Sequence, residues 1–139
     1  MKKALYILIQ CTWGLPATLI GLGFYLFNKY RRGCEHGPYR CSVDTKWNAR
    51  GGLSLGMFIF TPKDEVPGAQ LIRVHEYGHT IQNLVLGPLM FFVGVISVSW
   101  GNMKCFSRMR REKGVPYTAC FVEAWASRWG EKVTGEKAI

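Results

Sequence analysis

Long uncharged runs of apolar residues alternate with short charged segments along this chain of 139 residues. The first run covers residues 4–28 and contains no charged side chain. Because a helix rises about 1.5 Å per residue, a run of this length crosses the roughly 30 Å of hydrocarbon in a bilayer. Lysine and arginine flank it on both sides, and it is too long for a signal peptide. We expect one transmembrane helix over 4–28; a buried helix of a soluble protein is the alternative.

A second uncharged run, residues 80–103, is interrupted by Gly87 and Pro88. Proline lacks the amide donor and disfavours helical geometry in the residue before it, so two helices are expected in place of one. The segments on both sides, 29–75 and 104–139, each carry eight Lys and Arg, which places both on the cytoplasmic face by the positive-inside tendency. A hairpin that enters the membrane and returns fits this pattern, and a tilted full span is the alternative.

The remaining segments predict a single domain over 1–139. Residues 29–52 show no period and are expected to be a loop, whereas the apolar run 53–60 is bounded by turn residues and predicts a strand. Gly56 in its middle indicates that another segment approaches closely there. Further helices are expected at 69–86, 88–102 and 115–129. The predicted fold class is therefore mainly α, with membrane-embedded helices and one short edge strand.

Composition narrows the choice of partners. Eighteen Lys and Arg against nine Asp and Glu give a net charge of +9, which fits nucleic acid, an acidic partner or an anionic membrane. The basic segment 104–114 lies beside an apolar helix, where such residues normally contact lipid headgroups, so we expect a lipid bilayer and no nucleic acid. The five cysteines form no C-x-x-C pair and are expected to be ordinary thiols. A Cys34–Cys41 disulfide is the alternative if their loop is extracellular.

The candidate chemistry lies in His75-Glu76-Tyr77-Gly78-His79, an H-E-x-x-H motif at the head of the second apolar run. Residues four apart on a helix share one face, so His75 and His79 can both bind one Zn²⁺ ion. Glu76 lies one step around the helix, where it can accept a proton from a water molecule as a general base. Histidines at an aqueous interface are the alternative interpretation of this spacing.

A catalytic zinc normally takes three protein ligands, so one more must come from elsewhere. Glu123 is the best candidate, because it is the only acid in the apolar segment 115–127, where an unpaired carboxylate is costly and a metal offsets that cost. A salt-bridged Glu123 is the alternative. His36 is a weaker rival for the third ligand.

These residues resemble the gluzincin group of zinc metallopeptidases, through "HEYGH" on one helix and "EAWAS" on a later one. The resemblance implies that Ser127, four residues after Glu123, supports a zinc-bound histidine, although the family more often has an acid there. Gluzincins also use a tyrosine or histidine that stabilises the oxyanion, and Tyr117 is the candidate here.

The chain is also similar to small bacterial integral-membrane proteins of a minigluzincin-like type, which share "HEYGHT.Q", "LGPL" and "TWGLP". This resemblance implies a reduced gluzincin core in which the strand at 53–60 pairs with the backbone of a substrate; a strand merely packed in the core is the alternative. The predicted function is a membrane-bound zinc metallopeptidase that acts on a peptide or protein. The alternatives are a non-proteolytic zinc hydrolase at the membrane and a catalytically silent membrane adaptor that zinc stabilises.

Overall fold

A four-stranded mixed sheet forms the centre of the computed structural model, which describes residues 2–139. Its strands are β1 (His36–Tyr39), β2 (Ser42–Trp47), β3 (Leu53–Leu55) and β4 (Phe58–Pro62), in the spatial order β1-β2-β4-β3. β2 and β4 are parallel, whereas β1 and β3 are antiparallel to their neighbours. Every residue of β4 is buried, because helices cover both faces of the sheet. The predicted class, mainly α, is therefore corrected to mixed α/β with mostly helical content.

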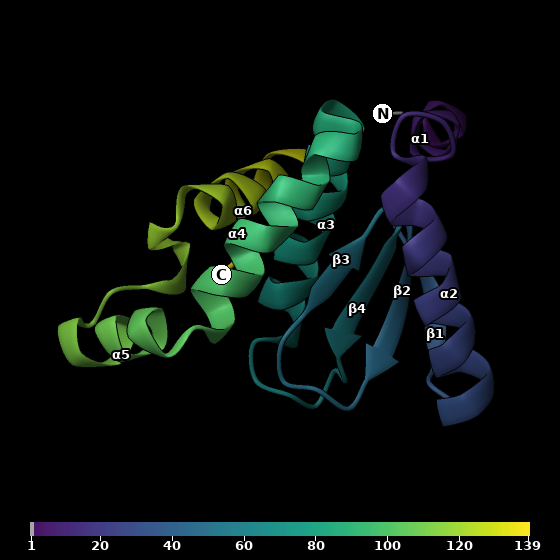
Figure 1. Cartoon of the computed structure of the whole chain (residues 1–139). Coiled ribbons are helices and arrows are strands. Elements are labelled where there is room, and N and C mark those ends of the chain that lie inside the picture. The colour runs from purple at the N-terminus through teal and green to yellow at the C-terminus, as the bar shows by residue number, and fades with distance from the viewer. Residues whose placement is uncertain (1) are drawn as a thin grey trace.

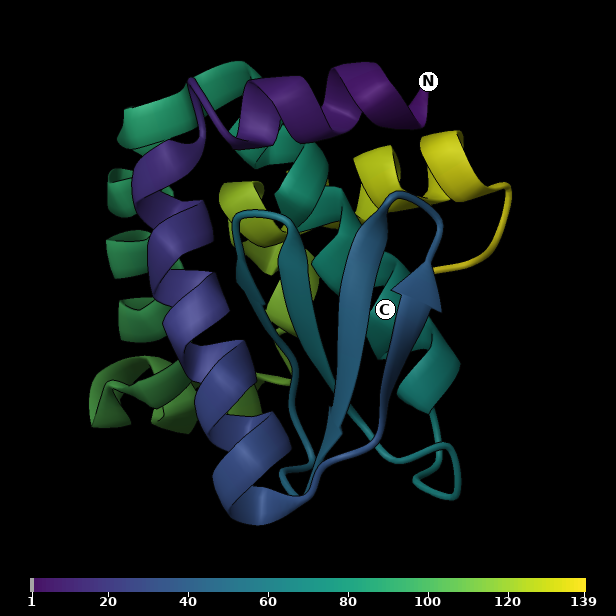
Figure 2. The same cartoon turned by 90° about the vertical axis from the view of Figure 1, so that its right-hand side faces the viewer.

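Helices form a layer on each side of this sheet (Figure 1). On one side lies α2 (Leu15–Arg32), whose Phe24 ring packs edge-on against Phe60 at a centroid distance of 4.9 Å. On the other side lie α3 (Ala69–Leu86) and α6 (Phe121–Thr134). In the view of Figure 2, α2 lies in front of the sheet and α3 and α6 lie behind it. The sheet thus separates α2 from the two helices that carry the candidate chemistry.

The remaining helices surround this core. They are α1 (Lys3–Gln10), α4 (Met90–Asn102), α5 (Lys104–Lys113) and the short 3₁₀ turns η1 (Gly87–Leu89) and η2 (Tyr117–Ala119). The basic segment 104–114 forms the helix α5, which buries none of its residues.

One continuous helix over 4–28 is wrong, because this run is divided into α1 and α2 with a bend of 97° between them; a membrane span over this run stays a prediction. Gly14 adopts a non-helical conformation and Pro16 lies in the first turn of α2, so the helix ends and restarts here. The run also contains buried polar side chains. Gln10 donates to the Thr80 carbonyl at 3.0 Å and accepts from Asn83 at 2.5 Å, which ties α1 to the end of α3.

By length and composition, one helical stretch of the described residues, Ala69–Asn102, could cross a membrane; α1 and α2 pass the same test only as a bent pair. The stretch changes direction at Gly87, whose φ of 52° and ψ of −122° lie outside the helical region. Figures 1 and 2 show α4 turning back from the end of α3. The interruption expected from Gly87-Pro88 is therefore present, with η1 between the two helices.

The segments expected to be a loop at 29–52 and one strand at 53–60 together form the sheet. Residues 29–52 contain β1 and β2, and residues 53–60 are divided by a turn at Gly56, where φ is +61°. A side chain at Gly56 would overlap the backbone of Thr18 in α2, so the expected close approach is present.

Buried polar residues of β2 explain why its pattern was not recognised as a strand. Asp44 is buried and accepts a hydrogen bond from Thr61 at 2.7 Å. It also lies 3.1 Å from the Lys46 ammonium and 3.0 Å from the Arg73 guanidinium, which ties the start of α3 to the sheet. A strand whose charged side chains are paired inside the fold does not show the usual alternation of apolar and exposed polar residues.

The glutamate helix begins at Phe121, not at 115, and continues through Gly130 to Thr134. Gly130 does not end the helix, because it lies where α6 touches the backbone of Val74 in α3. Gly78 of α3 faces the carbonyl of Ala126 in the same way. At both glycines an added methyl group would overlap a backbone oxygen, so this pair sets the close crossing of α3 and α6.

We expect Gly78→Ala to destabilise the protein by about 3 kcal/mol, because the new methyl group meets backbone that cannot rotate away. Gly23→Ala is the matched control: it is also a helical glycine, but a Cβ there meets nothing within 4 Å. This control should be neutral or stabilising by up to about 1 kcal/mol. Denaturant unfolding of both variants measures the difference, and equal midpoints would contradict the close crossing.

Candidate metal centre

His75, His79 and Glu123 converge in the space between α3 and α6. One ligand atom from each lies within 4.8 Å of the other two. The Glu123 Oε2 atom lies 3.0 Å from His75 Nε2 and 3.4 Å from His79 Nε2. The two histidines follow one another by a turn of α3, and the crossing at Gly78 brings Glu123 opposite them. The third ligand candidate chosen from sequence is therefore in place.

Burial makes this cluster costly without a cation. Glu123 is fully buried, and His75 and His79 are 2% and 6% exposed. The second carboxylate oxygen of Glu123, Oε1, is buried and has no hydrogen-bond partner. A buried carboxylate with an unpaired oxygen is unfavourable by several kcal/mol unless a positive charge is present, on the order of the cost of an uncompensated buried charge. The residues therefore fit a metal ion, and His₂Glu is a common donor set for one.

The far side of the His75 ring is held by Ser127. The His75 Nδ1 atom lies 2.8 Å from the Ser127 hydroxyl, which in turn donates to the main-chain oxygen of Ile139 at 2.9 Å. Since that hydroxyl has given its hydrogen to Ile139, it is free to accept the N–H of the imidazole. Ser127 thus lies where the resemblance to gluzincins expects a supporting residue.

The far side of the His79 ring is held by Gln82, which the sequence interpretation did not select. The His79 Nδ1 atom lies 2.7 Å from Gln82 Oε1, and the Gln82 amide donates to the Val122 carbonyl at 2.9 Å. With its nitrogen used as the donor, the glutamine can only accept from the imidazole. Its position three residues after His79 puts it on the same helical face, and this spacing was the available signal.

These two contacts favour a hydrogen on Nδ1 of each imidazole. If Nδ1 of each neutral ring carries the hydrogen and donates it, then Nε2 of each ring presents a lone pair. Both Nε2 atoms point at the same oxygen of Glu123. Three electron-rich atoms at this separation repel one another unless a proton or a metal ion lies among them. The outer hydrogen bonds therefore prepare the cluster to bind a metal ion.

Glu76 lies beside this cluster without being one of its three members. It is 6% exposed, and a Cβ at Gly52 would overlap its carboxylate. Gly52 directly precedes β3, so the start of the edge strand lies against Glu76. The sequence interpretation used Gly52 only as a turn residue and missed this contact.

Tyr117, the candidate oxyanion donor, lies in η2 with its ring centroid 6.3 Å from that of His75. Burial, together with the nearby charge of Glu123, raises the pKa of Tyr117 to about 12. The phenol therefore keeps its hydrogen at neutral pH and can donate it.

His36, the weaker rival for third ligand, does not belong to the metal-binding group formed by the described residues. It is exposed on β1, where its ring lies edge-on to Tyr25. All five cysteines are free thiols, including Cys34 and Cys41.

No protein-family model, curated protein or solved structure matches the chain at a significant level. The interpretation of the site therefore depends on its own geometry.

We expect Gln82→Met to lower metal affinity about 10- to 100-fold, because His79 loses the acceptor that fixes its tautomer. Gln70→Met is the matched control on the same helix. Gln70 is exposed, and it contacts Glu136, which is not a candidate metal ligand. Competition with a chromogenic zinc chelator measures both affinities. An unchanged affinity in Gln82→Met would show that the glutamine does not orient a ligand.

Proposed function

We propose that this chain is a zinc metallopeptidase attached to a membrane, with its site at the cytoplasmic face. One observation carries the proposal: two histidines whose Nδ1 atoms are both engaged elsewhere direct their Nε2 atoms at one buried carboxylate oxygen of Glu123. An open His₂Glu site on an H-E-x-x-H helix is typical of metal-assisted peptide hydrolysis. The substrate is a peptide or protein.

In this proposal His75, His79 and Glu123 hold the ion. When bound, Zn²⁺ supplies Lewis acidity, which polarises the scissile carbonyl and makes a water molecule a better nucleophile. Glu76 accepts the proton of the attacking water at its carboxylate and passes it to the leaving amine nitrogen. Tyr117 donates a hydrogen bond to the oxygen that gains negative charge. Ser127 and Gln82 keep the two imidazoles in the tautomer that binds metal.

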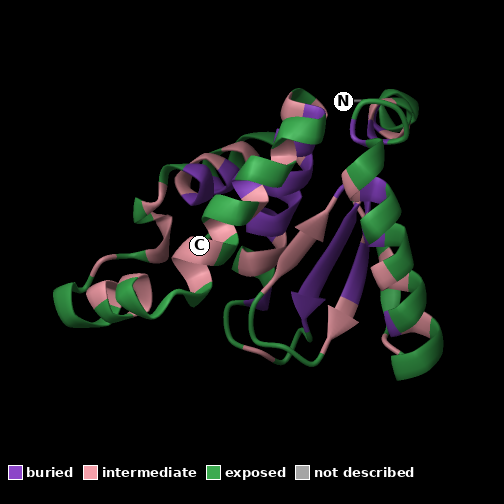
Figure 3. Cartoon of the chain, viewed as in Figure 1, coloured by how far each residue is buried: buried purple, intermediate pink, exposed green. Residues whose placement is uncertain are grey.

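The membrane part of the proposal is supported by three helices that are exposed over much of their length (Figure 3) and whose exposed residues include many large apolar ones. Exposed apolar patches often mark membrane or protein interaction sites. Only Val93 of α4 is buried, and the basic helix α5 follows it directly, as expected at a headgroup layer. The exposed large apolar residues of α1, α2 and α4 are Leu5, Leu8, Leu15, Leu19, Ile20, Leu22, Leu26, Phe27, Phe91, Phe92, Val95, Ile96 and Val98.

Glu76→Gln tests the reaction. We expect it to lower peptide hydrolysis by at least about 100-fold, because general base catalysis is lost, while bound zinc stays near one ion per chain. Glu123→Gln is the comparison variant and should lose the zinc itself. Metal analysis of the purified chains and cleavage of a peptide library measure the two effects. Hydrolysis that survives Glu76→Gln would refute the assignment of the base.

The alternative functions give different results in the same experiment. A zinc hydrolase that acts on another bond would bind one ion and cleave no peptide in the library. A silent adaptor would keep zinc but show no hydrolysis of any substrate, and Glu76→Gln would change nothing. Both outcomes would contradict the peptidase and preserve the metal centre.

The membrane attachment is tested by adding a charge to α4. We expect Phe92→Lys to impair membrane insertion, because a lysine in an apolar membrane helix is unfavourable by up to about 2.5–3.5 kcal/mol, the cost at the helix centre. Phe121→Lys is the matched control, since Phe121 is exposed to a similar extent but lies at the start of α6. Alkaline carbonate extraction of membranes from expressing cells measures retention of each chain. Complete release of the unchanged protein by carbonate would refute the attachment.

A further inference from the structure

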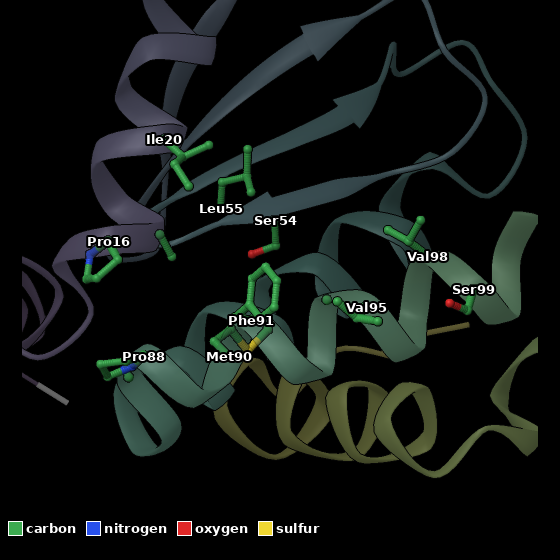
Figure 4. Close-up of a pocket in the computed structure, with 13 residues that line it drawn as sticks. Pro16, Ile20, Ser54, Leu55, Pro88, Met90, Phe91, Val95, Val98 and Ser99 are labelled. Atoms are coloured by element: carbon green, nitrogen blue, oxygen red, sulfur yellow. The ribbon is translucent and has the colours of Figure 1, made fainter.

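A cavity of about 460 Å³ lies between α2, the edge of the sheet and α4 (Figure 4). Ser54 and Ser99 carry the only polar side chains among its 13 lining residues, and no lining residue is charged. Ligand sites in proteins measure roughly 300–1,000 Å³ and are mostly apolar, so both size and chemistry fit a bound apolar group.

One wall of this cavity is the edge strand β3, which has a strand partner on one side only. In an antiparallel pair, alternate residues direct their backbone N–H and C=O groups away from the partner. Ser54, the middle residue of β3, brings this edge to the cavity, whereas the Leu55 carbonyl packs against Gly21 of α2. Such groups need hydrogen-bond partners when they are covered, and an extended peptide supplies them whereas a lipid acyl chain does not. The wall therefore favours a polypeptide as the occupant.

The same strand connects the cavity to the candidate metal centre. Gly52 precedes β3 directly and lies against the Glu76 carboxylate. In a segment that pairs with β3, the backbone would consequently lie near Glu76. Its side chains would point into the cavity. Alternate side chains of a strand point to the same side at a spacing of about 6.6 Å, so residues i and i+2 of the segment would enter together.

The mouth of the cavity is apolar as well. Ile20, Phe91 and Val98 line the cavity and are also exposed, and they belong to the surface proposed to face lipid. Figure 4 shows the Phe91 ring close to Ser54, between α4 and the strand edge. An apolar segment can therefore reach the strand without crossing a charged rim.

We propose that this cavity binds an extended, apolar segment of a polypeptide, which pairs with β3 and places large apolar side chains at positions i and i+2 between α2 and α4. The proposal rests on the proposed function and names the substrate class of the same site. The substrates it identifies are membrane-derived segments that have lost their helical hydrogen bonds, not polar peptides.

The test fills the cavity from one wall. Gly94 lines it from α4 and a Cβ there meets nothing within 4 Å, so Gly94→Phe occupies the space without a clash at its base. Gly23→Phe is the matched control, because Gly23 is equally free of neighbours but does not line the cavity. Binding is measured by fluorescence anisotropy in lipid nanodiscs, on chains that also carry Glu76→Gln. The probes are a peptide with Leu at i and i+2 and the same peptide with Ser at both.

We expect the Leu peptide to bind at least about tenfold more tightly than the Ser peptide, because two apolar side chains leave water. Gly94→Phe should abolish that preference, and Gly23→Phe should leave it within twofold. Equal binding of the two peptides, or a preference that survives Gly94→Phe, would overturn the proposal. If Gly94→Phe does not fold, Ala17→Phe fills the cavity from α2 and decides the question in the same way.

The two proposals fail in different ways. Binding does not require hydrolysis, so a Leu preference without any cleavage by the unchanged chain would refute the peptidase and keep the cavity assignment. Cleavage of peptides without a Leu preference would refute the cavity assignment and keep the peptidase.

Discussion

The backbone contact between α3 and α6 is the constraint on which the rest of the structure depends. Gly78 faces Ala126 and Gly130 faces Val74, and neither position has room for a side chain. Because the two helices cross so closely, residues that lie one turn apart on α3 face the first turn of α6. Glu123 then meets His75 and His79 because of where the helices cross, not because of any sequence proximity. The convergence of the three candidate ligands thus depends on two glycines.

The close crossing buries four ionisable side chains, and the surrounding polar contacts compensate for that burial. Ser127 and Gln82 each satisfy the outer nitrogen of one imidazole, while the inner nitrogens and Glu123 have only one another. Such an arrangement is unfavourable on its own and becomes favourable with a cation. A cation bound at this cluster would therefore couple metal binding to folding.

The sequence predicted those elements whose signals all lie within the element itself. The helix at 69–86 has the expected bounds, and Glu123 could be selected because an acid in an apolar segment needs a partner. The bend between α1 and α2 was missed because the run was judged by its lack of charged residues alone. The buried polar Gln10, which bonds to Thr80 and Asn83 of α3, was not considered. β2 was missed because Asp44 is neutralised by Arg73 from a later helix. The predicted end of the last helix at 129 was wrong because Gly130 continues α6 and contacts the backbone of Val74. Each failure concerns a residue whose partner is distant in sequence.

The helix α4 explains how a buried polar centre and an exposed apolar surface can coexist in a small chain. It is apolar on all sides, and such a helix is normally either fully buried or in contact with lipid. Here Val93 packs inward while Phe91, Val95 and Val98 face outward or toward the cavity. The indole of Trp100 donates to the Tyr117 carbonyl at 2.8 Å, so the end of α4 is fixed beside the turn that carries the candidate oxyanion donor. One helix thereby forms a wall of the cavity and presents its outer face to lipid in the proposed setting, and this combination requires the uncharged sequence between Gly87 and Lys104.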